Sequence, residues 1–478
     1  VTPATYHLTH RRNQLIDIFI HFANNVPMLI NLEAPASVGR PSSDAVLAML
    51  PLLFSDPAGA LGQLVHEHGP LVLLEVGPVQ ALLVTDPDGV REVLVEQQHC
   101  LAKGAAVKST RPILGDGLLT SEGAHHARQR RLVSPAFHRP QLAKFAVTMG
   151  QIAAEETGSW VAETVIDAHA AMTRTAMRIV GSTLFGLDVT GDAARVGVAL
   201  DGVLAISNRL LPLAQLVGQG LSPDEQSAAA QLIAELDDVI AGIIAQRRAA
   251  PGDRDVVSLL TRAVDDEGDG GGLSDREIRD EVMTLFLAGH ETTANALAWT
   301  LHLLSHHPEA LAQIAAEADR CGTDTGAAGL DQLEQLPITQ AALREGMRLF
   351  PPAWLTTREV VQPTTIRGVD LAVGAQVIVS PWLTQRDPRW WPDADEFRID
   401  RWLYPDEQRP KWAYFPFGGG ARGCIGEHFA MLEATIILAE VARRWTISPA
   451  GDAPEPEFRV TLRPTPAVPL RLQRRAPH

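Results

Sequence analysis

The sequence is poor in cysteine, in positive charge and in long apolar runs. Its 478 residues include three cysteines, Cys100, Cys321 and Cys424, which lie far apart and form no C-x-x-C pair. This pattern excludes a disulfide framework and a four-cysteine zinc site, and it is typical of a reduced, intracellular protein. We therefore expect a cytoplasmic protein.

Positive charge is the second deficit. The chain has 41 Lys and Arg residues against 57 Asp and Glu residues, which gives a net charge of −16 and a pI near 5.4. A surface of this charge repels duplex nucleic acid over most of its area. We expect no nucleic-acid partner.

Apolar runs are also short. The one candidate membrane segment, residues 15–32, contains Asp17, His21 and Pro27, whereas a spanning helix needs about 20 mostly apolar residues. No secretory signal pattern is visible either. We therefore expect no membrane span, and this segment is predicted to be an amphipathic or surface helix.

Helical patterns dominate the rest of the chain. Strand-like runs occur at 71–85 and between 356 and 381, and the strand–helix alternation of a Rossmann fold is absent. Apolar residues recur at helical spacing over 140–185, 191–217, 222–250, 308–320 and 339–349. These patterns predict a mainly α fold with small β-sheets. We assign residues 41–478 to a single domain and residues 1–40, which include the 15–32 segment, to an N-terminal extension.

One helix is expected to be unusually long. An acidic glycine loop over 263–273 ends just before Ser274, which forms a capping-box pattern with Glu277, and the apolar residues beyond run on to Pro308. About 33 residues at about 1.5 Å each make a rod of roughly 50 Å, enough to cross the protein. We expect this helix to organise the domain.

Residues 415–426, FPFGGGARGCIG, allow two interpretations. The glycines satisfy G-x-G-x-x-G, but Pro416 stands where a dinucleotide site requires a central strand, so a phosphate site is disfavoured. Beyond Cys424 the sequence has the apolar spacing of a helix, which places the sulfur at or before a helix N-terminus, where a thiolate is favoured. For an isolated cysteine the alternative is a buried structural residue.

The full pattern decides between them, because F-G-x-G-x-R/H-x-C-x-G resembles the haem-ligand loop of the cytochromes P-450. The residues in the motif's places are Phe417, Gly418, Gly420, Arg422, Cys424 and Gly426. The resemblance implies that Cys424 is the axial thiolate ligand of the iron of haem b, with Phe417 packed beside it and with Gly418, Arg422 and Gly426 among the cofactor-binding residues. Thiolate ligation favours O–O cleavage in such proteins.

The long helix carries AGHETT, residues 288–293, which resembles the oxygen-activating segment of the same family. Ala288 and Gly289 would let a flat macrocycle approach the helix backbone. The resemblance makes Glu291 and Thr292 the catalytic pair that guides protons to the oxygen. Taken alone, both could be ordinary helix residues. A zinc-protease H-E-x-x-H pattern is excluded, because position 294 is alanine.

Two further sets of residues follow from the resemblance. The E-x-x-R pair of the family corresponds to Glu345 and Arg348, and a later arginine to Arg401; together they would support the ligand loop. The haem propionates need cationic partners in an apolar interior. The corresponding positions are His126, Arg130, Arg358 and Arg422.

The resemblance, which runs from about residue 60 to the C-terminus, implies a haem-thiolate monooxygenase. Such an enzyme inserts one oxygen atom from O2 into an apolar organic substrate, by hydroxylation or epoxidation. We expect a monomer that receives electrons from a separate ferredoxin and ferredoxin reductase, because about fifty residues after Cys424 leave no room for flavin or iron–sulfur domains.

The predicted substrate walls are aliphatic, and a terpenoid or similar natural product is favoured. They include the 102–119 loop, a roof over 200–217, Leu285, Ala288, Thr292, Trp354 and Leu355. The alternatives are a peroxide-dependent peroxygenase or fatty-acid hydroxylase, a dehydratase or isomerase, and a non-catalytic haem sensor. The Glu291–Thr292 pair argues against enzymes that use no external electrons.

Overall fold

The computed structural model describes residues 35–475 apart from 36, 78, 187–221, 251, 253, 269 and 322–334. The predicted helix at 191–217, the roof at 200–217 and nearly all of the 1–40 extension, including the 15–32 segment, lie outside this part of the chain.

Helices make up most of the described chain. The helices before the central one are α2 (Ser43–Ser55), α3 (Pro57–His68), α4 (Pro87–Arg91), the π-helix η1 (Glu92–Glu96), α5 (Ala105–Lys108), α6 (Arg111–Leu114), α7 (Gly123–Val133), the 3-10 helix η2 (Ser134–Phe137), α8 (Arg139–Ser159), α9 (Ala168–Phe185), α12 (Pro223–Ala249) and α13 (Val256–Leu260). The others are α14 (Asp275–Ser305), α15 (Pro308–Arg320), α17 (Pro337–Leu349), α18 (Pro381–Thr384), α19 (Asp400–Leu403), the 3-10 helices η4 (Lys411–Ala413) and η5 (Gly420–Arg422), and α20 (Glu427–Arg444). The mainly α prediction is confirmed.

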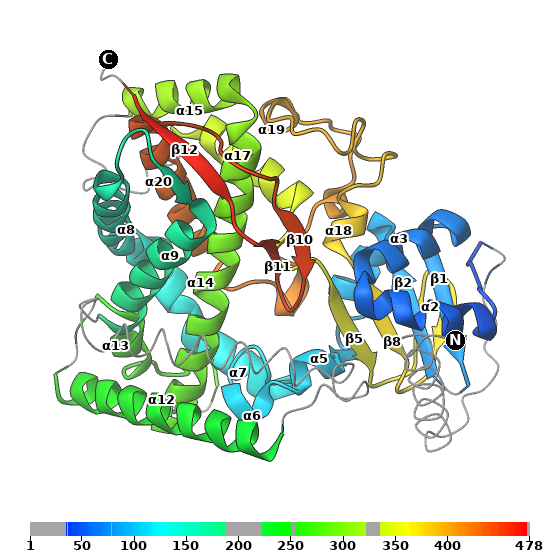
Figure 1. Cartoon of the computed structure of the whole chain (residues 1–478). Coiled ribbons are helices and arrows are strands. Elements are labelled where there is room, and N and C mark those ends of the chain that lie inside the picture. Colours follow the sequence, from blue (N-terminus) through cyan, green and yellow to red (C-terminus); the bar gives the residue numbers. More distant parts are fainter. Residues whose placement is uncertain are drawn as a thin grey trace.

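The central helix α14 is the long helix predicted from the sequence (Figure 1). Its capping box is complete, because the Ser274 side chain accepts from the Glu277 N–H at 3.3 Å and the Glu277 carboxylate accepts from the Ser274 N–H at 2.8 Å. The helix is 31 residues long and ends at Ser305, just before Pro308 opens α15. Such a cap contributes about 1 kcal/mol to the helix.

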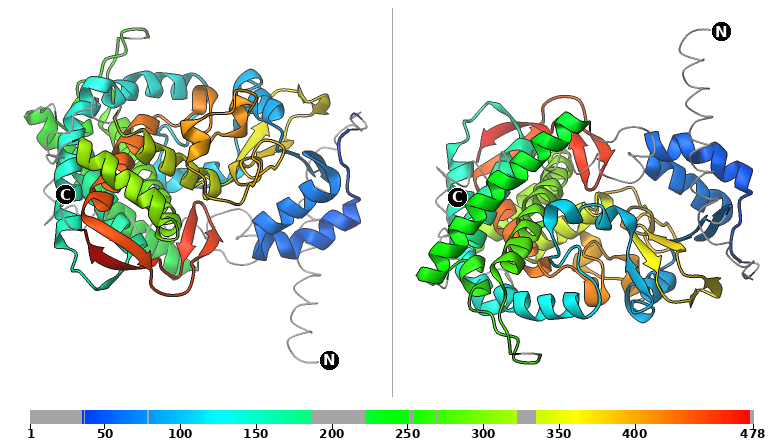
Figure 2. Two further views of the ribbon diagram at one scale, coloured as in Figure 1. Left: turned by 90° about the horizontal axis from the view of Figure 1, so that it is seen from above. Right: turned by 90° about the horizontal axis from the view of Figure 1, so that it is seen from below.

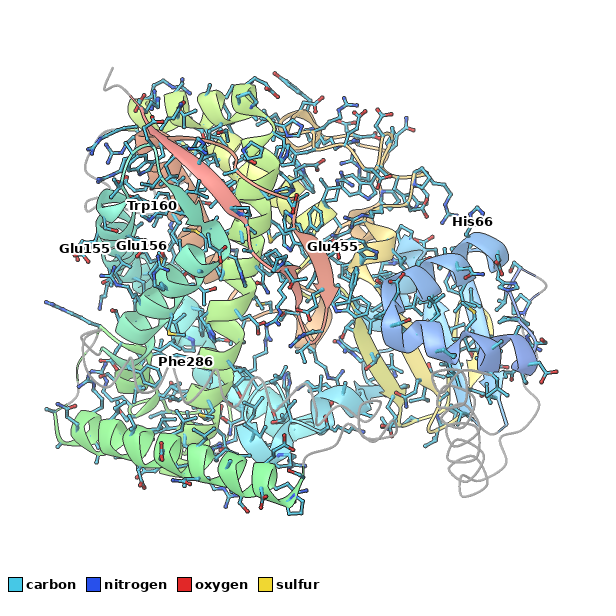
Figure 3. The ribbon with its side chains drawn as sticks, in the orientation of Figure 1. His66, Glu155, Glu156, Trp160, Phe286 and Glu455 are labelled. Carbon is cyan, nitrogen blue, oxygen red and sulfur yellow. The ribbon has the colours of Figure 1, made fainter. Side chains whose placement is uncertain are left out.

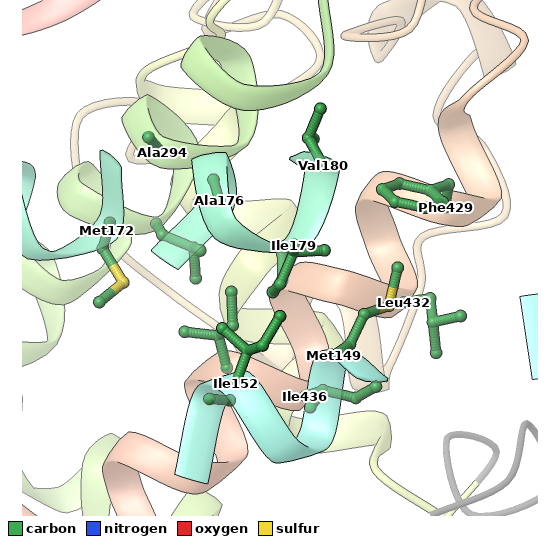
Figure 4. Close-up of a cluster of buried hydrophobic side chains, with 14 of the residues drawn as sticks. Met149, Ile152, Met172, Ala176, Ile179, Val180, Ala294, Phe429, Leu432 and Ile436 are labelled. Atoms are coloured by element: carbon green, nitrogen blue, oxygen red, sulfur yellow. The ribbon is translucent and has the colours of Figure 1, made fainter. Parts of the chain in front are cut away.

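The main core packs around α14. Figure 4 shows side chains of α8, α9, α14 and α20 interlocking, with Met149, Ile179, Ala294 and Leu432 among them. Burial of each large aliphatic side chain of this kind contributes about 1.5–3 kcal/mol. Residues on α20 therefore hold the segment that follows Cys424 against the rest of the helices.

The helical pattern at 140–185 forms two helices rather than one. The chain leaves α8 at Trp160, where the backbone becomes extended, and the short strand β4 (Val165–Asp167) pairs with the C-terminal strand β12 (Pro469–Arg474) before Asp167 caps α9. Figure 3 shows Glu156 near the end of α8 and Trp160 beyond it; the Trp160 indole donates to Glu156 at 3.3 Å. Pairing with a distant strand overrides the local pattern here.

The main sheet combines both ends of the chain, as predicted. Its five strands are ordered β1 (Leu71–Val76), β2 (Val79–Val84), β8 (Gln376–Val379), β5 (Thr356–Val360) and β3 (Leu101–Lys103). The smaller sheets contain β6 (Thr364–Ile366), β7 (Val369–Leu371), β9 (Trp445–Pro449), β10 (Glu455–Phe458) and β11 (Leu462–Thr465), together with β4 and β12.

The arrangement places the helices on one side of the molecule and the main sheet with α2 and α3 on the other (Figures 1 and 2). The β10–β11 hairpin lies between α14 and the sheet, and Glu455 marks its first strand in Figure 3. None of the helices in the described part of the chain is both long and apolar enough to cross a membrane.

Candidate active site

The loop before α20 depends on glycine. Gly418 and Gly420 have φ values of +67° and +66°, a backbone region that residues with a side chain rarely adopt. A Cβ on Gly420 would also lie 2.1 Å from the Leu94 carbonyl oxygen. The Cys424 N–H donates to the Phe417 carbonyl at 2.9 Å and closes the loop. The glycine pattern therefore shapes the loop that presents Cys424.

The Cys424 thiol lies three residues before the first residue of α20, and Gly426 is the N-cap of that helix. The side chain is exposed to solvent, yet the protein around it is dense enough that burial raises the pKa of the thiol. We infer that the thiol faces an enclosed space rather than the outer surface. The Gly426 N–H and the charge of Arg130 oppose the effect of burial on the pKa. A bound metal cation would remove the remaining cost of ionising the sulfur.

One face of α14 is open in the middle of the helix. Ala288 is exposed although Leu285 and Thr293 on the same helix are buried. The Thr292 hydroxyl donates to the Ala288 carbonyl at 2.7 Å, a back-bond that locally loosens a helix. Gly289 differs from Ala288, because a Cβ on it would lie 3.2 Å from Val180 of α9. Gly289 is thus at a helix-packing contact.

The predicted acid, Glu291, is hydrogen-bonded to the C-terminal hairpin. Its Oε1 accepts from the Thr461 hydroxyl at 2.8 Å. Thr461 lies in the turn between β10 and β11, which the sequence analysis did not connect to the site.

Cations gather between α7, β3, β5 and the cysteine loop. Lys103 and Arg358 are opposite each other in the β3–β5 pairing and are both buried. Arg422 donates to Glu122 at 2.7 Å, and the Glu122 carboxylate also accepts from the Lys103 backbone N–H. His126, one turn after Glu122, is buried as well. This group, Lys103, His126, Arg358 and Arg422, is called the cation cluster below.

The pKa values in the cation cluster are shifted by burial and by the charges of neighbouring cations. Burial, followed by the charges of Lys103, Arg422 and Arg130, lowers the pKa of His126 to about 4. Burial, together with the charge of Arg422, lowers the pKa of Lys103 to about 8 and that of Arg358 to about 10. Three buried groups whose pKa values are lowered in this way favour the binding of an anion beside them.

Arg130 contacts the cysteine loop directly. Its Nη1 donates to the Gly423 carbonyl at 2.8 Å. The structure therefore places Arg130 beside Cys424. This contact is separate from the hydrogen bonds that join Glu122 to Lys103 and Arg422.

The second predicted set of charges forms a closed network under the loop. Arg348 makes two bonds of 2.9 Å to Glu345, both residues are fully buried, and Arg401 Nε lies 3.3 Å from Glu345 Oε1. The Trp402 indole donates to the same carboxylate at 2.9 Å. Trp402 stands where the family often has phenylalanine, and its indole supplies a further hydrogen bond to Glu345.

Gln385 joins this network to the chain that enters the cysteine loop. Its amide nitrogen donates to the Met347 and Arg348 carbonyls, and its oxygen accepts from the Phe415 N–H at 3.0 Å. The Arg348 guanidinium in turn donates to the Gln385 carbonyl at 3.0 Å. The position of the loop thus depends on the buried Glu345–Arg348 pair.

Comparison with known proteins identifies the family. Residues 46–472 match the family model described as Cytochrome P-450. The chain belongs to the cytochrome P-450 family. It is accordingly an oxidoreductase of the monooxygenase type, as predicted from the cysteine loop and the AGHETT segment.

Three curated proteins from Streptomyces are similar to this P-450. The chain is 38% identical over 414 residues to cyclooctatin synthase of Streptomyces melanosporofaciens, covering 84% of this chain and 89% of that one. It is 35% identical over 415 residues to pentalenene oxygenase of Streptomyces avermitilis, covering 86% and 91%. It is also 32% identical to cyclooctat-9-en-7-ol 5-monooxygenase of S. melanosporofaciens over 87% of this chain and 91% of that one.

Solved structures support the fold of this P-450. The heme domain of cytochrome P450DA superimposes with a TM-score of 0.80 at 26% identity, covering 90% of this chain and 95% of that domain. The predicted P-450 fold, a long central helix with small sheets, is confirmed.

The residues of this P-450 fit a haem. Glu122 is the ionised carboxylate beside the cation cluster. The positive charges of Lys103, Arg358 and Arg422 exceed its negative charge and can balance the negative charges of two propionates. Cys424 lies just before the N-terminus of α20, where a thiolate is favoured, and is suited to be an axial ligand. Ala288 adds an open helix face without a bulky side chain.

The predicted substrate residues have different environments in this P-450. Leu285 is 8% exposed and Leu355 is partly buried. The Trp354 side chain is 7% exposed, packs edge to face on Phe458 and donates to the Arg459 carbonyl at 2.8 Å. Trp354 thereby anchors the β10–β11 hairpin.

Sequence reasoning missed two functional candidates, Lys103 and Thr461. Lys103 was assigned only to the 102–119 wall, and its membership of the cation cluster follows from the pairing of β3 with β5. Thr461 lies in a region without a motif. The one local signal was the spacing of Glu291 and Asn295, a carboxyl and an amide four positions apart on the same helix. This spacing indicates that polar side chains meet on one face of α14.

Proposed function

We propose that this cytochrome P-450 oxidises a cyclic terpenoid. The observation that carries the proposal is the similarity to cyclooctatin synthase and pentalenene oxygenase, over 84% and 86% of the chain respectively. The exposed position of Ala288 and the aliphatic residues around it suit an apolar ring system. Hydroxylation and epoxidation are the expected reactions.

In this proposal, Cys424 would hold haem b through its sulfur, and the cation cluster and Arg130 would hold it through charge. When bound, the haem supplies the activation of dioxygen and the transfer of one oxygen atom. Gly426 stabilises the ionised sulfur by donating its N–H, and the N-terminus of α20 adds its dipole. Phe417 and Gly418 shape the loop around that ligand.

Protons reach the oxygen through the side chains of α14. Thr292 holds a proton on Oγ1, which is bonded to the Ala288 carbonyl and can turn toward a ligand on the exposed helix face. Glu291 exchanges protons at its carboxylate. Leu285 and Leu355 help to exclude water from that face.

We further propose that a ferredoxin and a ferredoxin reductase supply the electrons, that the protein works as a cytoplasmic monomer, and that residues 41–478 form one catalytic domain. Glu345, Arg348 and Arg401 have a structural role, because they are joined through Gln385 to the chain that enters the cysteine loop.

The test combines a spectrum with a reaction. We expect the reduced carbon-monoxide form of the wild type to show the red-shifted Soret band of thiolate ligation. Cys424→His should keep the haem and lose that band. With a ferredoxin, its reductase and NADPH, we expect the wild type to oxidise at least one cyclic diterpene or sesquiterpene from a panel.

A thiolate-type band in Cys424→His would overturn the ligand assignment. Oxidation of linear fatty acids, with no spectral shift or turnover for the cyclic terpenes, would overturn the substrate class. Turnover with peroxide but not with reduced ferredoxin would overturn the electron source.

A further inference from the structure

Glu291 is the end of a hydrogen-bonded chain that starts near the surface. His169 Nε2 lies 2.9 Å from Asn295 Oδ1, Asn295 Nδ2 donates to Thr461 Oγ1 at 3.2 Å, and Thr461 Oγ1 donates to Glu291 Oε1 at 2.8 Å. Asn295 is fully buried and Thr461 is 8% exposed, whereas His169, at the start of α9, is half-buried. The chain therefore leads from a half-buried imidazole to the predicted acid.

The fold fixes the middle of this hydrogen-bonded series, where Asn295 and Thr461 lie. Glu291 and Asn295 are one turn apart on α14, so their side chains share a face. Thr461 enters between them from the hairpin turn, and that turn is fixed because the Trp354 indole donates to the Arg459 carbonyl at 2.8 Å. Thr461 contacts both residues without a flexible element in between.

The hydrogen bonds have one consistent direction. Thr461 has one hydroxyl proton, which it donates to Glu291 while it accepts from the Asn295 amide. Asn295 Oδ1 must then accept from the protonated Nε2 of His169. Every donor points toward the carboxylate, and bonds aligned in this way strengthen one another. In this arrangement Oε1 of Glu291 only accepts, and it carries no proton.

A second arrangement satisfies all four groups when a proton sits on Oε1 of Glu291. In it, a protonated Glu291 donates to Thr461, Thr461 donates to the Asn295 oxygen of an amide turned by half a rotation, and the Asn295 nitrogen donates to an unprotonated Nε2 of His169. The ring position of the His169 proton therefore reports the direction of the hydrogen bonds, and with it whether Oε1 of Glu291 carries a proton.

We propose that His169, Asn295 and Thr461 are positioning residues that set the orientation and protonation of Glu291. The inference rests on the proposed monooxygenase role of Glu291 and Thr292. Uptake of one solvent proton by Glu291 reverses the chain, and His169 moves its single ring proton from Nε2 to Nδ1 through solvent. No other group gains or loses a proton. When Glu291 gives its proton up on the Thr292 side, the chain returns to its first direction.

The experiment uses the haem-loaded enzyme and three hairpin variants. Thr461→Val removes the hydroxyl at nearly constant shape, Thr461→Ser keeps it, and Thr465→Val on the same hairpin is the matched control. The first measurement is the fraction of NADPH electrons recovered in product rather than in peroxide. The second is the ring-nitrogen NMR signal of His169, assigned with His169→Gln, in the diamagnetic reduced carbon-monoxide form.

We expect Thr461→Val to lower the product fraction by about 3- to 10-fold and to change the His169 signal from the Nε2–H form to a mixture. Thr461→Ser should restore both readouts, and Thr465→Val should leave both as in the wild type. If Thr461→Val fails to fold, His169→Leu serves instead, with His169→Gln as its rescue because glutamine can still donate to Asn295.

A wild type that shows thiolate ligation and oxygenation, beside a Thr461→Val variant with unchanged product fraction and unchanged His169 signal, would overturn this inference alone. A wild type without oxygenation would overturn the proposed function instead. An equal loss in Thr461→Ser and Thr461→Val, with an unchanged His169 signal, would show a merely structural role and also overturn the inference.

Discussion

Two buried charge groups flank the cysteine loop, and they are built in opposite ways. Around Glu345, the carboxylate is fully paired by Arg348, Arg401 and neighbouring donors. In the cation cluster, the positive side chains outnumber Glu122, the nearby ionised acid. The first group is complete within the protein, whereas the second needs an anion from outside.

Glu281 shows why the cation cluster stays positive. It is fully buried on α14, and burial raises the pKa of its carboxyl to about 8. At neutral pH it is mostly protonated and compensates little of the charge on Lys103. A closed group of charges stabilises a fold, and an open one binds a ligand.

The largest expected effect comes from breaking the closed group of charges around Glu345. Glu345→Gln leaves Arg348 and Arg401 buried without a carboxylate, and we expect a loss of about 3–5 kcal/mol in the free energy of unfolding. Urea unfolding of the haem-loaded protein measures it. Glu309→Gln, at an exposed position of α15, is the control and should change stability by no more than about 0.5 kcal/mol. Equal stability of the two variants would contradict the closed group.

The next effect concerns the open group. Arg358→Leu should speed haem loss to apomyoglobin by about 10-fold, because a charge-assisted hydrogen bond contributes roughly 1.5–3 kcal/mol. The same change should leave the haem-free protein no less stable, since Arg358 is already a buried cation among cations. Arg91→Leu, at a surface ion pair with Glu96, is the control. Haem loss at the wild-type rate would show that the cluster does not hold the propionates.

The smallest effect is a pH dependence. The pKa of His126 is lowered to about 4 in the folded protein, so between pH 4 and about 6.5 the unfolded chain binds more protons and stability falls as the pH falls. From pH 7.5 to 5.5 the haem-free wild type should lose about 1 kcal/mol more than His126→Gln, after allowance for solvent screening. Thermal unfolding at both pH values measures it; parallel losses would place His126 outside the cluster.

Local sequence predicted the features that local geometry requires. The capping box of Ser274 and Glu277, and the glycines that give positive φ at 418 and 420, are recognisable because each motif does its work within a few residues. The Glu345–Arg348 pair was also recognisable, through its resemblance to the buried E-x-x-R pair of the family. The function of the chain followed from these motifs and their order.

Long-range pairing accounts for what the sequence did not predict. The hydrogen bond from Thr461 to Glu291 joins positions 170 residues apart. Neither residue type indicates this contact in the sequence. Lys103 enters the cation cluster through strand register with Arg358. The division of the 140–185 pattern into α8 and α9 depends on β12, which is formed by the last described residues.

The parallel pairing of β2 with β8 has a consequence for biosynthesis. Ala81 pairs with Gln376, so this edge of β2 has no partner until the ribosome has added about 295 further residues. At about 5–20 residues per second, this interval lasts roughly 15–60 s. During that time the nascent β1–β2 hairpin presents free backbone groups that could capture a neighbouring chain. Slower initiation, lower growth temperature or added chaperone should therefore raise the soluble yield more than any change to the haem supply.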